Sequence, residues 1–444
     1  MTDILFSVMF ALVPFIALVL LLCSGISLRR FSIPSFFIIF YLVSSYIGIL
    51  PLYFGWNSYS VSIGVVDRAI MLKMFIYSSA ALIMVICGFI YAHRVLGFNT
   101  NVVKDRVLVS ANLIQRMFMF CLFLLCGLIF LAYIRQIETI ALFKALNNDI
   151  AGALVARSNM GTTFEGKYWR YHMFFRHLLD YCVIFFFADY LIKRHRISIL
   201  IFGGSFLVAT FSATMSIEKG PFVKLLIMLY LTYVIYKGGN YWQSATKYFV
   251  IAIITILTIF ITHFMNAPDI TSALKSIASR VFVGQITPAY FYLDLFPRHM
   301  GYLWGASLPN PGGLLPFQPF PLTVVVSNII SPEQLVKGIV GTAPTVFWAE
   351  MYVNFGTIGV IFSSFLVGVV LFVVSHILSR FSLSTPVIAA TVLLAMHYRT
   401  LTETGLSSYF FDTKLFLIAA ITFMALSLRR RIIIHRRVPS TKTN

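Results

Sequence analysis

The sequence predicts an all-α integral membrane protein that crosses the bilayer many times. Of its 444 residues, 59% are hydrophobic and only 11% are charged, and the mean hydropathy is +0.89. Apolar runs of about 17–25 residues, the length that a helix needs to cross the hydrocarbon core, recur along the chain. The basic residues gather in every second hydrophilic gap between these runs, as in multi-pass proteins. We treat residues 1–444 as one membrane domain.

Each apolar run is expected to form one spanning helix, which gives about eleven transmembrane helices. In chain order the runs cover residues 4–24, 32–52, 69–91, 114–134, 172–192, 198–216, 221–237, 246–265, 356–378, 385–400 and 411–428. The first run lacks a basic n-region and a small-residue cleavage site, so we expect a permanent helix rather than a signal peptide. The run that begins at Pro221 is short, and the run at 385–400 gives the weakest signal.

The hydrophilic gaps fall into two sets by charge. One set carries more than half of the 34 lysines and arginines and a single acid; it comprises residues 28–31, 92–113 with Arg116, 193–197, 237–247, 379–384 and the basic tail 429–444. The other set carries most of the 15 acidic residues. Because lysine and arginine concentrate in cytoplasmic loops, we expect the N-terminus outside and the C-terminus inside. The net charge of +19 is then a topology signal, and we expect no nucleic-acid partner.

Two loops on the predicted outer face, 135–171 and 266–355, are too long to be simple connectors. Long loops of this kind usually carry function. The second loop also contains a passage dense in glycine and proline, residues 309–321. We expect it to handle the substrate.

Short amphipathic or re-entrant helices are expected within the second loop. One begins after Asp269 as N-cap and carries an apolar stripe at helical spacing. Another runs from Ser331, an N-cap followed by proline, to Gly341. A third starts at Pro344 and is interrupted at Gly356, before the ninth spanning helix.

Ionisable side chains in or next to the apolar runs concentrate at the outer ends of the helices. At the centre of a spanning helix such a side chain costs about 2.5–3.5 kcal/mol on insertion scales, so these residues are functional candidates. Together they predict a basic, partly acid-balanced cavity facing the outer leaflet, suited to an anionic lipid head group such as a pyrophosphate. Substrate contacts are expected from Arg176, Lys219, Lys224, His263 and Arg399.

Structural roles compete with this interpretation. Arg176 and Asp180 are four residues apart and can pair on one helix face. Lys219 and Lys414 can extend their side chains to lipid head groups.

The sequence predicts no cofactor. No Walker loop, GxGxxG, HExxH, CxxC or GxSxG motif occurs in a suitable context. All five cysteines lie in apolar runs, and none has metal-site spacing. We therefore expect no metal, an activity that survives chelators, and an activated substrate as the source of energy.

Several short motifs resemble a known family. They are Glu218-Lys-Gly-Pro221 after an apolar helix, Arg280 at the start of the long outer loop, Tyr302-Leu-Trp-Gly305, and Thr342-Ala-Pro followed by Glu350-Met-Tyr-Val-Asn-Phe-Gly356. With the plan of eleven or twelve helices and two outer loops, the chain resembles the oligosaccharide repeat-unit polymerases, the Wzy-type O-antigen polymerases.

The resemblance implies an integral, GT-C-like glycosyltransferase of the bacterial inner membrane. Such an enzyme transfers a growing glycan from undecaprenyl pyrophosphate onto a new lipid-linked repeat unit at the periplasmic face, to build O-antigen, capsule or exopolysaccharide. The implied partners are the lipid-linked donor and acceptor, the bilayer and a chain-length regulator protein.

Mapped onto this chain, the resemblance implies that Arg157 and Arg280 hold the pyrophosphate and that Glu350 is the base. Tyr302, Trp304 and Trp348 would stack on sugars. Fixed arginines stabilise charge that develops on the leaving group, and a carboxylate takes the proton of the attacking hydroxyl. The structural alternatives are that Arg157 caps a loop helix, that the tryptophans are interfacial anchors, and that Glu350 pairs with a buried arginine.

Two other functions remain open at this stage. A lipid-linked glycan ligase, similar to O-antigen ligases, uses the same donor chemistry with a different acceptor. A lipid-linked oligosaccharide flippase or transporter is less favoured, because transporters usually show internal repeats and polar breaks at the midplane, and this sequence shows neither.

Overall fold

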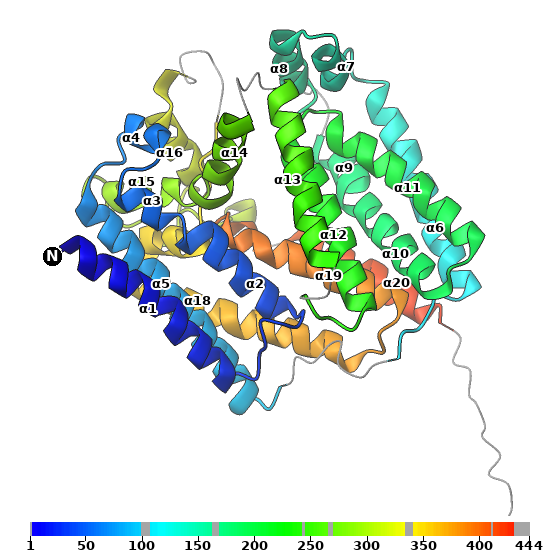
Figure 1. Cartoon of the computed structure of the whole chain (residues 1–444), viewed down its shortest axis with the longest axis horizontal. Helices are drawn as coiled ribbons and strands as arrows, with labels where there is room; N and C mark the ends of the chain where they lie inside the picture. The colour runs from blue at the N-terminus through cyan, green and yellow to red at the C-terminus, as the bar shows by residue number, and fades with distance from the viewer. Residues whose placement is uncertain are drawn as a thin grey trace, which may run out of the picture.

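The structure is a computed structural model that describes residues 2–98, 107–161, 168–241, 245–264, 270–333, 341–409 and 412–429. Within these ranges the chain is built from helices, and apart from two isolated bridges it has no β-pairing (Figure 1). Among the described residues, seven helical stretches are long and apolar enough to cross a membrane. The predicted all-α, multi-pass membrane fold is confirmed.

Every predicted apolar run coincides with helix. The seven long stretches are Asp3–Cys23, Ile33–Tyr53, Arg68–Arg94, Leu113–Ile134, Arg196–Thr214, Phe347–Arg380 and Leu406–Ser427. The remaining runs form α10 (Leu179–Lys193), α12 (Lys219–Tyr236), α13 (Ala245–Phe264) and α19 (Thr385–Arg399). α19 has 15 residues and rises only about 22 Å, whereas α10, of the same length, continues directly from a π-helix before it. The count of eleven spanning helices therefore stays a prediction.

The long stretches have the following elements. They are α1 (Thr2–Cys23), α2 (Ile33–Tyr41) continued by the π-helix η1 (Leu42–Tyr46) and α3 (Ile49–Tyr53), α5 (Arg68–Arg94), α6 (Leu113–Ile134), α11 (Arg196–Thr214), α18 (Phe347–Arg380) and α20 (Thr413–Ser427). α10 is preceded by α9 (Tyr168–His172) and the π-helix η2 (Met173–Leu178), and α19 is followed by η5 (Thr400–Thr402) and η6 (Leu406–Tyr409).

Glycine allows α5 and α18 to pack with their backbones in close contact. A Cβ added at Gly88 would lie 2.3 Å from the carbonyl oxygen of Phe365, and one at Gly368 would lie 2.1 Å from that of Val85. Small residues at such contacts are typical of membrane helix pairs, where backbone approach and van der Waals packing replace the hydrophobic driving force. α5 and α18 therefore form a closely packed helix pair.

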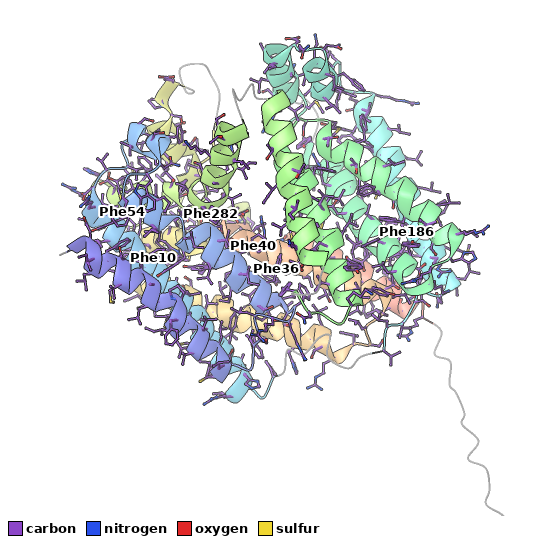
Figure 2. The ribbon with its side chains drawn as sticks, in the orientation of Figure 1. Phe10, Phe36, Phe40, Phe54, Phe186 and Phe282 are labelled. Carbon is purple, nitrogen blue, oxygen red and sulfur yellow. The ribbon has the colours of Figure 1, made fainter. Side chains whose placement is uncertain are left out.

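Aromatic side chains fill much of the space beside that pair. The ring of Phe10 on α1 stacks on Tyr46 of η1, with 4.6 Å between centroids. Phe36 and Phe40 of α2 and Phe282 are among the side chains labelled in Figure 2. Such ring pairs add stabilisation beyond the area that they bury.

The basic gaps of the sequence contact one another. The N–H of Phe31 donates to the carbonyl of Gly239 at 2.7 Å, and this joins the gaps 28–31 and 237–247. Val109 and Ser384 form an isolated bridge that joins two further gaps of the same set. These contacts join four of the basic gaps in two pairs, and residues 99–106, 242–244 and 430–444 of this set lie outside the described part.

The first outer loop contains α7 (Ala141–Leu146) and α8 (Ile150–Asn159), which lie at the top of Figure 1. The short helix α4 (Ser58–Ser62) lies near the second loop, which contains α14 (Ile270–Ala278), the π-helix η3 (Ser279–Val283), α15 (Thr287–Leu295), η4 (Pro311–Gly313) and α16 (Leu322–Ile330). In Figure 1, α14 and α16 of the second outer loop lie at the upper left.

Two of the expected loop helices are found. The amphipathic helix is α14 with η3, although its expected cap Asp269 lies outside the described residues. The helix before Gly356 begins at Phe347, and Gly356 interrupts it with φ 64° and ψ −150°. The helix expected from Ser331 to Gly341 falls largely on residues 334–340, which are not described, whereas α15 and α16 were not predicted.

Candidate functional site

A cavity of about 610 Å³ lies between α2, α12, α13, α14 with η3, and α19. It brings together three cations that the sequence singled out, Lys224, Arg280 and Arg399, with one carboxylate, Glu403. The rest of its lining is mostly apolar, with Phe40, Val43, Val223, Ile227, Ile253, Ile277, Val281 and Met396 beside the polar Ser44 and Gln285. The volume is typical of a small-molecule site. A charged group joined to an apolar chain matches this lining.

Arg280 reaches the cavity from the π-helix η3. Its backbone position depends on a close approach, because a Cβ at Gly48 would lie only 1.9 Å from the carbonyl oxygen of Phe282. The loop before α3 therefore presses directly on the η3 backbone. Arg280 itself is exposed. Single π-turns inside helices recur at functional sites, where they re-aim side chains.

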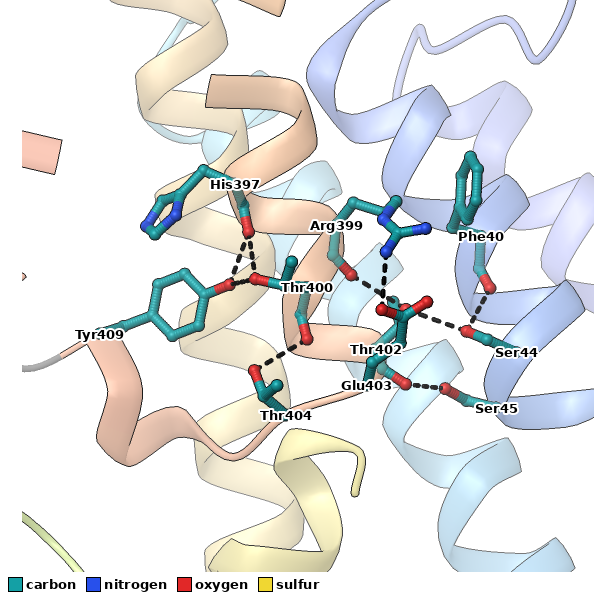
Figure 3. Close-up of polar contacts among 10 residues, drawn as sticks. All are labelled: Phe40, Ser44, Ser45, His397, Arg399, Thr400, Thr402, Glu403, Thr404 and Tyr409. Atoms are coloured by element: carbon teal, nitrogen blue, oxygen red, sulfur yellow. Dashed lines mark hydrogen bonds and ion pairs between the residues drawn. The ribbon is translucent and has the colours of Figure 1, made fainter. Parts of the chain in front are cut away.

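Arg399 and Glu403 approach the cavity from the end of α19 (Figure 3). The guanidinium of Arg399 donates to Glu403 at 2.6 Å and lies over the ring of Phe40, 4.8 Å from its centroid. The turn between them is tied to η1, because Ser45 Oγ donates to the carbonyl of Thr402 at 2.8 Å. Both charges are therefore fixed in direction before any ligand binds.

Lys224 forms an ion pair with Asp180, and 3.8 Å separates its Nζ from the carboxylate. The sequence spacing offers Arg176 as the alternative partner of this acid. The π-helix η2 contains Arg176 and ends directly before α10, so the wider turn changes the angle between the two positions. Arg176 is only 7% exposed and does not line the cavity. Its direct contact with substrate is not supported by this position.

Glu350 does not occupy the position of a base in this cavity. Its side chain is 5% exposed and accepts hydrogen bonds from Ser307 Oγ at 3.1 Å and from the Ser407 N–H at 2.9 Å. A Cβ at Gly405 would lie 2.3 Å from its Oε2. Glu350 therefore holds the loop after α19 and lies outside the lining of this cavity, and its role as base stays a prediction.

The motifs behind the family resemblance pack against one another. The N–H groups of Leu303 and Trp304 donate to the carbonyls of Val353 and Asn354, each at 3.0 Å. The Asn354 amide oxygen accepts from the N–H of Gly305 at 3.0 Å. Residues distant in sequence thus form one hydrogen-bonded unit beside Glu350.

The three aromatic residues expected to stack on sugars differ from one another in burial and in contacts. Trp348 is fully buried, so neither face of its ring is open to a sugar, and we withdraw it from the site. Tyr302 packs against Tyr352, with 6.0 Å between ring centroids. Trp304 is 73% exposed and has a positive φ of 48°. None of these three aromatic residues lines the cavity that contains Lys224, Arg280 and Arg399.

Arg157 lies in the last turn of α8 and pairs with Glu218 at 3.3 Å, where both side chains are well exposed. The other end of α8 is capped by Asp149, which accepts from the Gly152 N–H at 2.8 Å. That hydrogen bond lowers the pKa of Asp149. Arg157 thus links the first outer loop to the start of α12, away from the cavity lining.

Two expected residues are placed only by their backbones. Lys219 begins α12 and His263 lies near the end of α13, and their side chains are outside the described part. Among the described residues, no group of three or more His, Cys, Asp and Glu could hold a metal ion.

The main residue that sequence reasoning left out of the site is Glu403. The signal was available, since Glu403 follows Arg399 by four residues at the outer end of an apolar run. Ser44 and Gln285 gave no signal, because only the packing of η1 and of the residues after η3 around the cavity brings them there.

The fold and this cavity define a multi-pass helical membrane protein with a basic, partly apolar cavity between its helices. In comparisons with known proteins, no family model, curated protein or solved structure matches this chain. The likeness to the repeat-unit polymerases therefore stays a prediction.

Proposed function

We propose that this protein is a membrane glycosyltransferase that polymerises undecaprenyl-pyrophosphate-linked repeat units at the periplasmic face of a bacterial inner membrane. The single observation that carries the proposal is the cavity where Lys224, Arg280 and Arg399 converge beside an apolar wall. Guanidinium forks suit phosphate oxygens, and the apolar residues suit the first isoprene units of the carrier. The N-terminus and both long loops are periplasmic in this proposal.

In the proposed reaction, one proton is transferred to the protein and one leaving group departs. An acceptor hydroxyl oxygen bonds to the anomeric carbon of the donor as the bond from that carbon to the pyrophosphate oxygen breaks. The hydroxyl proton passes to Glu403, the one carboxylate in the described lining, and undecaprenyl pyrophosphate leaves. Arg280 and Arg399 stabilise the charge that grows on the departing phosphate.

The test is complementation of a strain that lacks this chain, with the glycan ladder as readout. Arg280→Ala at normal protein level is expected to abolish long chains, and Arg280→Lys, which keeps the charge and loses the fork, to shorten them. Arg298→Ala is the matched control, since Arg298 is exposed and lies outside the cavity lining.

The glycan that accumulates separates a polymerase from a ligase. Loss of polymerisation leaves single repeat units attached to the final acceptor. If the deletion strain instead holds full-length chains that stay on the lipid carrier, the protein is a ligase and the polymerase proposal fails.

A further inference from the structure

A second cavity, of about 360 Å³, lies next to the first. Its wall is formed by α4, η3, the start of α15, α16 and the segment 341–344. The described lining contains no charged side chain. Its polar groups are hydroxyls and one amide, including Ser60, Ser279, Gln285, Thr287, Ser327 and Thr342.

The π-helix η3 and the two residues after it form the wall between the two cavities. We call the cavity with Lys224, Arg280 and Arg399 the basic cavity, and the second, uncharged one the neutral cavity. Ser279 and Val283 line the neutral cavity, whereas Arg280 and Val281 line the basic cavity. Gln285 borders both. Adjacent residues on one short helix thus divide into a charged face and an uncharged face. A ligand that enters both cavities meets cations on one side of η3 and hydroxyls on the other.

Existing hydrogen bonds set the direction of one hydroxyl in the neutral cavity. The amide Nδ2 of Asn57 donates to Ser279 Oγ at 2.7 Å, so the hydroxyl proton of Ser279 is left to be donated. The ring of Tyr59, which is largely exposed, borders the same space. Uncharged hydrogen-bonding groups with an aromatic ring are the chemistry that recognises sugar hydroxyls and the apolar face of a sugar ring.

From this arrangement we infer that the neutral cavity is a glycan subsite, which holds uncharged sugars bonded directly to the pyrophosphate in the basic cavity. The inference rests on the proposed function and adds the position and chemistry of the sugar site. A glycosyl pyrophosphate has its charge and its neutral hydroxyls on adjacent groups, in the same order as the two cavities across η3. The site excludes sugars whose carboxylates would be buried there without a cation.

The experiment measures two ligands separately on the purified full-length protein. One probe is undecaprenyl pyrophosphate without sugar, and the other is the cell's own repeat-unit oligosaccharide, released from its carrier by mild acid. Ser327→Leu fills the neutral cavity, and Thr342→Val removes a hydroxyl at nearly constant volume, which covers the case in which Ser327→Leu does not fold. Asn328→Leu is the control, at the next position of α16 and outside the lining.

Ser327→Leu is expected to weaken oligosaccharide binding about tenfold or more, and Thr342→Val about three- to tenfold, the effect of one lost hydrogen bond. Both variants should bind undecaprenyl pyrophosphate like the wild type, and Asn328→Leu should bind both probes normally. The inference is overturned if the wild type does not bind the oligosaccharide, or if both lining variants bind it as the wild type does. If undecaprenyl pyrophosphate does not bind but the oligosaccharide does so through Ser327 and Thr342, the proposed function fails and the glycan site stands.

Discussion

The carboxylate of Glu350 accepts a hydrogen bond from the backbone N–H of Ser407 at 2.9 Å, across the 57 positions that separate them in the chain. Gly405 makes this approach possible, because any side chain there would meet the Glu350 carboxylate. The loop held in this way leads back to Glu403 and Arg399, two of the charged groups of the basic cavity. Glu350 thus holds in place the loop that follows these two residues.

Glu350→Gln is expected to lower stability more than chemistry. The amide oxygen of the new side chain can still accept from the Ser407 N–H, but its NH2 group then faces Ser307 Oγ, which already accepts from Asn354 Nδ2. Ser307 Oγ therefore loses the carboxylate oxygen to which it donates, and an unsatisfied buried group costs about 1–3 kcal/mol. Thermal unfolding in detergent should show a lower midpoint, and activity per folded molecule should fall less than tenfold. A variant with wild-type stability and no activity would return Glu350 to the role of base. Gly405→Ala should reproduce the stability loss.

Glu403→Gln is expected to remove activity while the protein stays folded. If Glu403 takes the acceptor proton, its loss should slow transfer about 10²–10⁴-fold, as for other general bases. Binding of undecaprenyl pyrophosphate should persist, because Lys224, Arg280 and Arg399 remain. The measurement is the rate of glycan extension in membranes at matched protein level. Normal extension by Glu403→Gln would exclude it as the base.

Gly368→Val should destabilise the pair of α5 and α18. The added Cβ would lie 2.1 Å from the carbonyl oxygen of Val85, so the two backbones must separate. Overpacking of this kind costs about 1–3 kcal/mol. Fluorescence-detected thermal unfolding is the readout, with Gly127→Val as control, since a Cβ at Gly127 meets no atom within 4 Å. Equal midpoints for the two variants would contradict the packing described here.

The topology predicts that residue 310 is outside the cell membrane and residue 382 inside. Phosphatase and galactosidase fusions at Asn310 and Ser382 measure this directly. The phosphatase should be active only at position 310 and the galactosidase only at position 382. The reverse pattern would show that the orientation of the protein in the membrane is opposite to the predicted one. Activity of the same reporter at both positions would show that the predicted number of membrane crossings between them is wrong.

The membrane fold could be predicted because its signals are local. Apolar length and the alternation of basic gaps locate the long apolar helices, without knowledge of which helices touch. The loop helices α15 and α16 could not be found in this way. They are nine residues long, and their burial is decided by distant partners, as when Tyr292 of α15 donates to the carbonyl of Ala343.

The candidate site was predictable in composition and not in arrangement. Position beside apolar runs identified Lys224 and Arg399, the family resemblance pointed to Arg280, and tertiary packing brings the three into one cavity. The resemblance gave Glu350 and Trp348 functional roles, and sequence does not show that Glu350 is enclosed beside Gly405 or that Trp348 is fully buried. π-Helices were a further cause of error, since they rotate residues such as Arg176 away from the face that a regular helix would give them.

The central claim is that the basic cavity holds the pyrophosphate of a lipid carrier. Its most direct test is the affinity of the purified protein for undecaprenyl pyrophosphate, compared with that of Arg280→Ala and of Arg298→Ala as control. Loss of one preorganised charged donor should cost about 2–4 kcal/mol where it acts on the phosphate, by analogy with oxyanion donors. We predict that Arg280→Ala binds at least thirtyfold more weakly, about the lower end of that range, and that Arg298→Ala binds like the wild type. Equal affinities for all three proteins would contradict the claim.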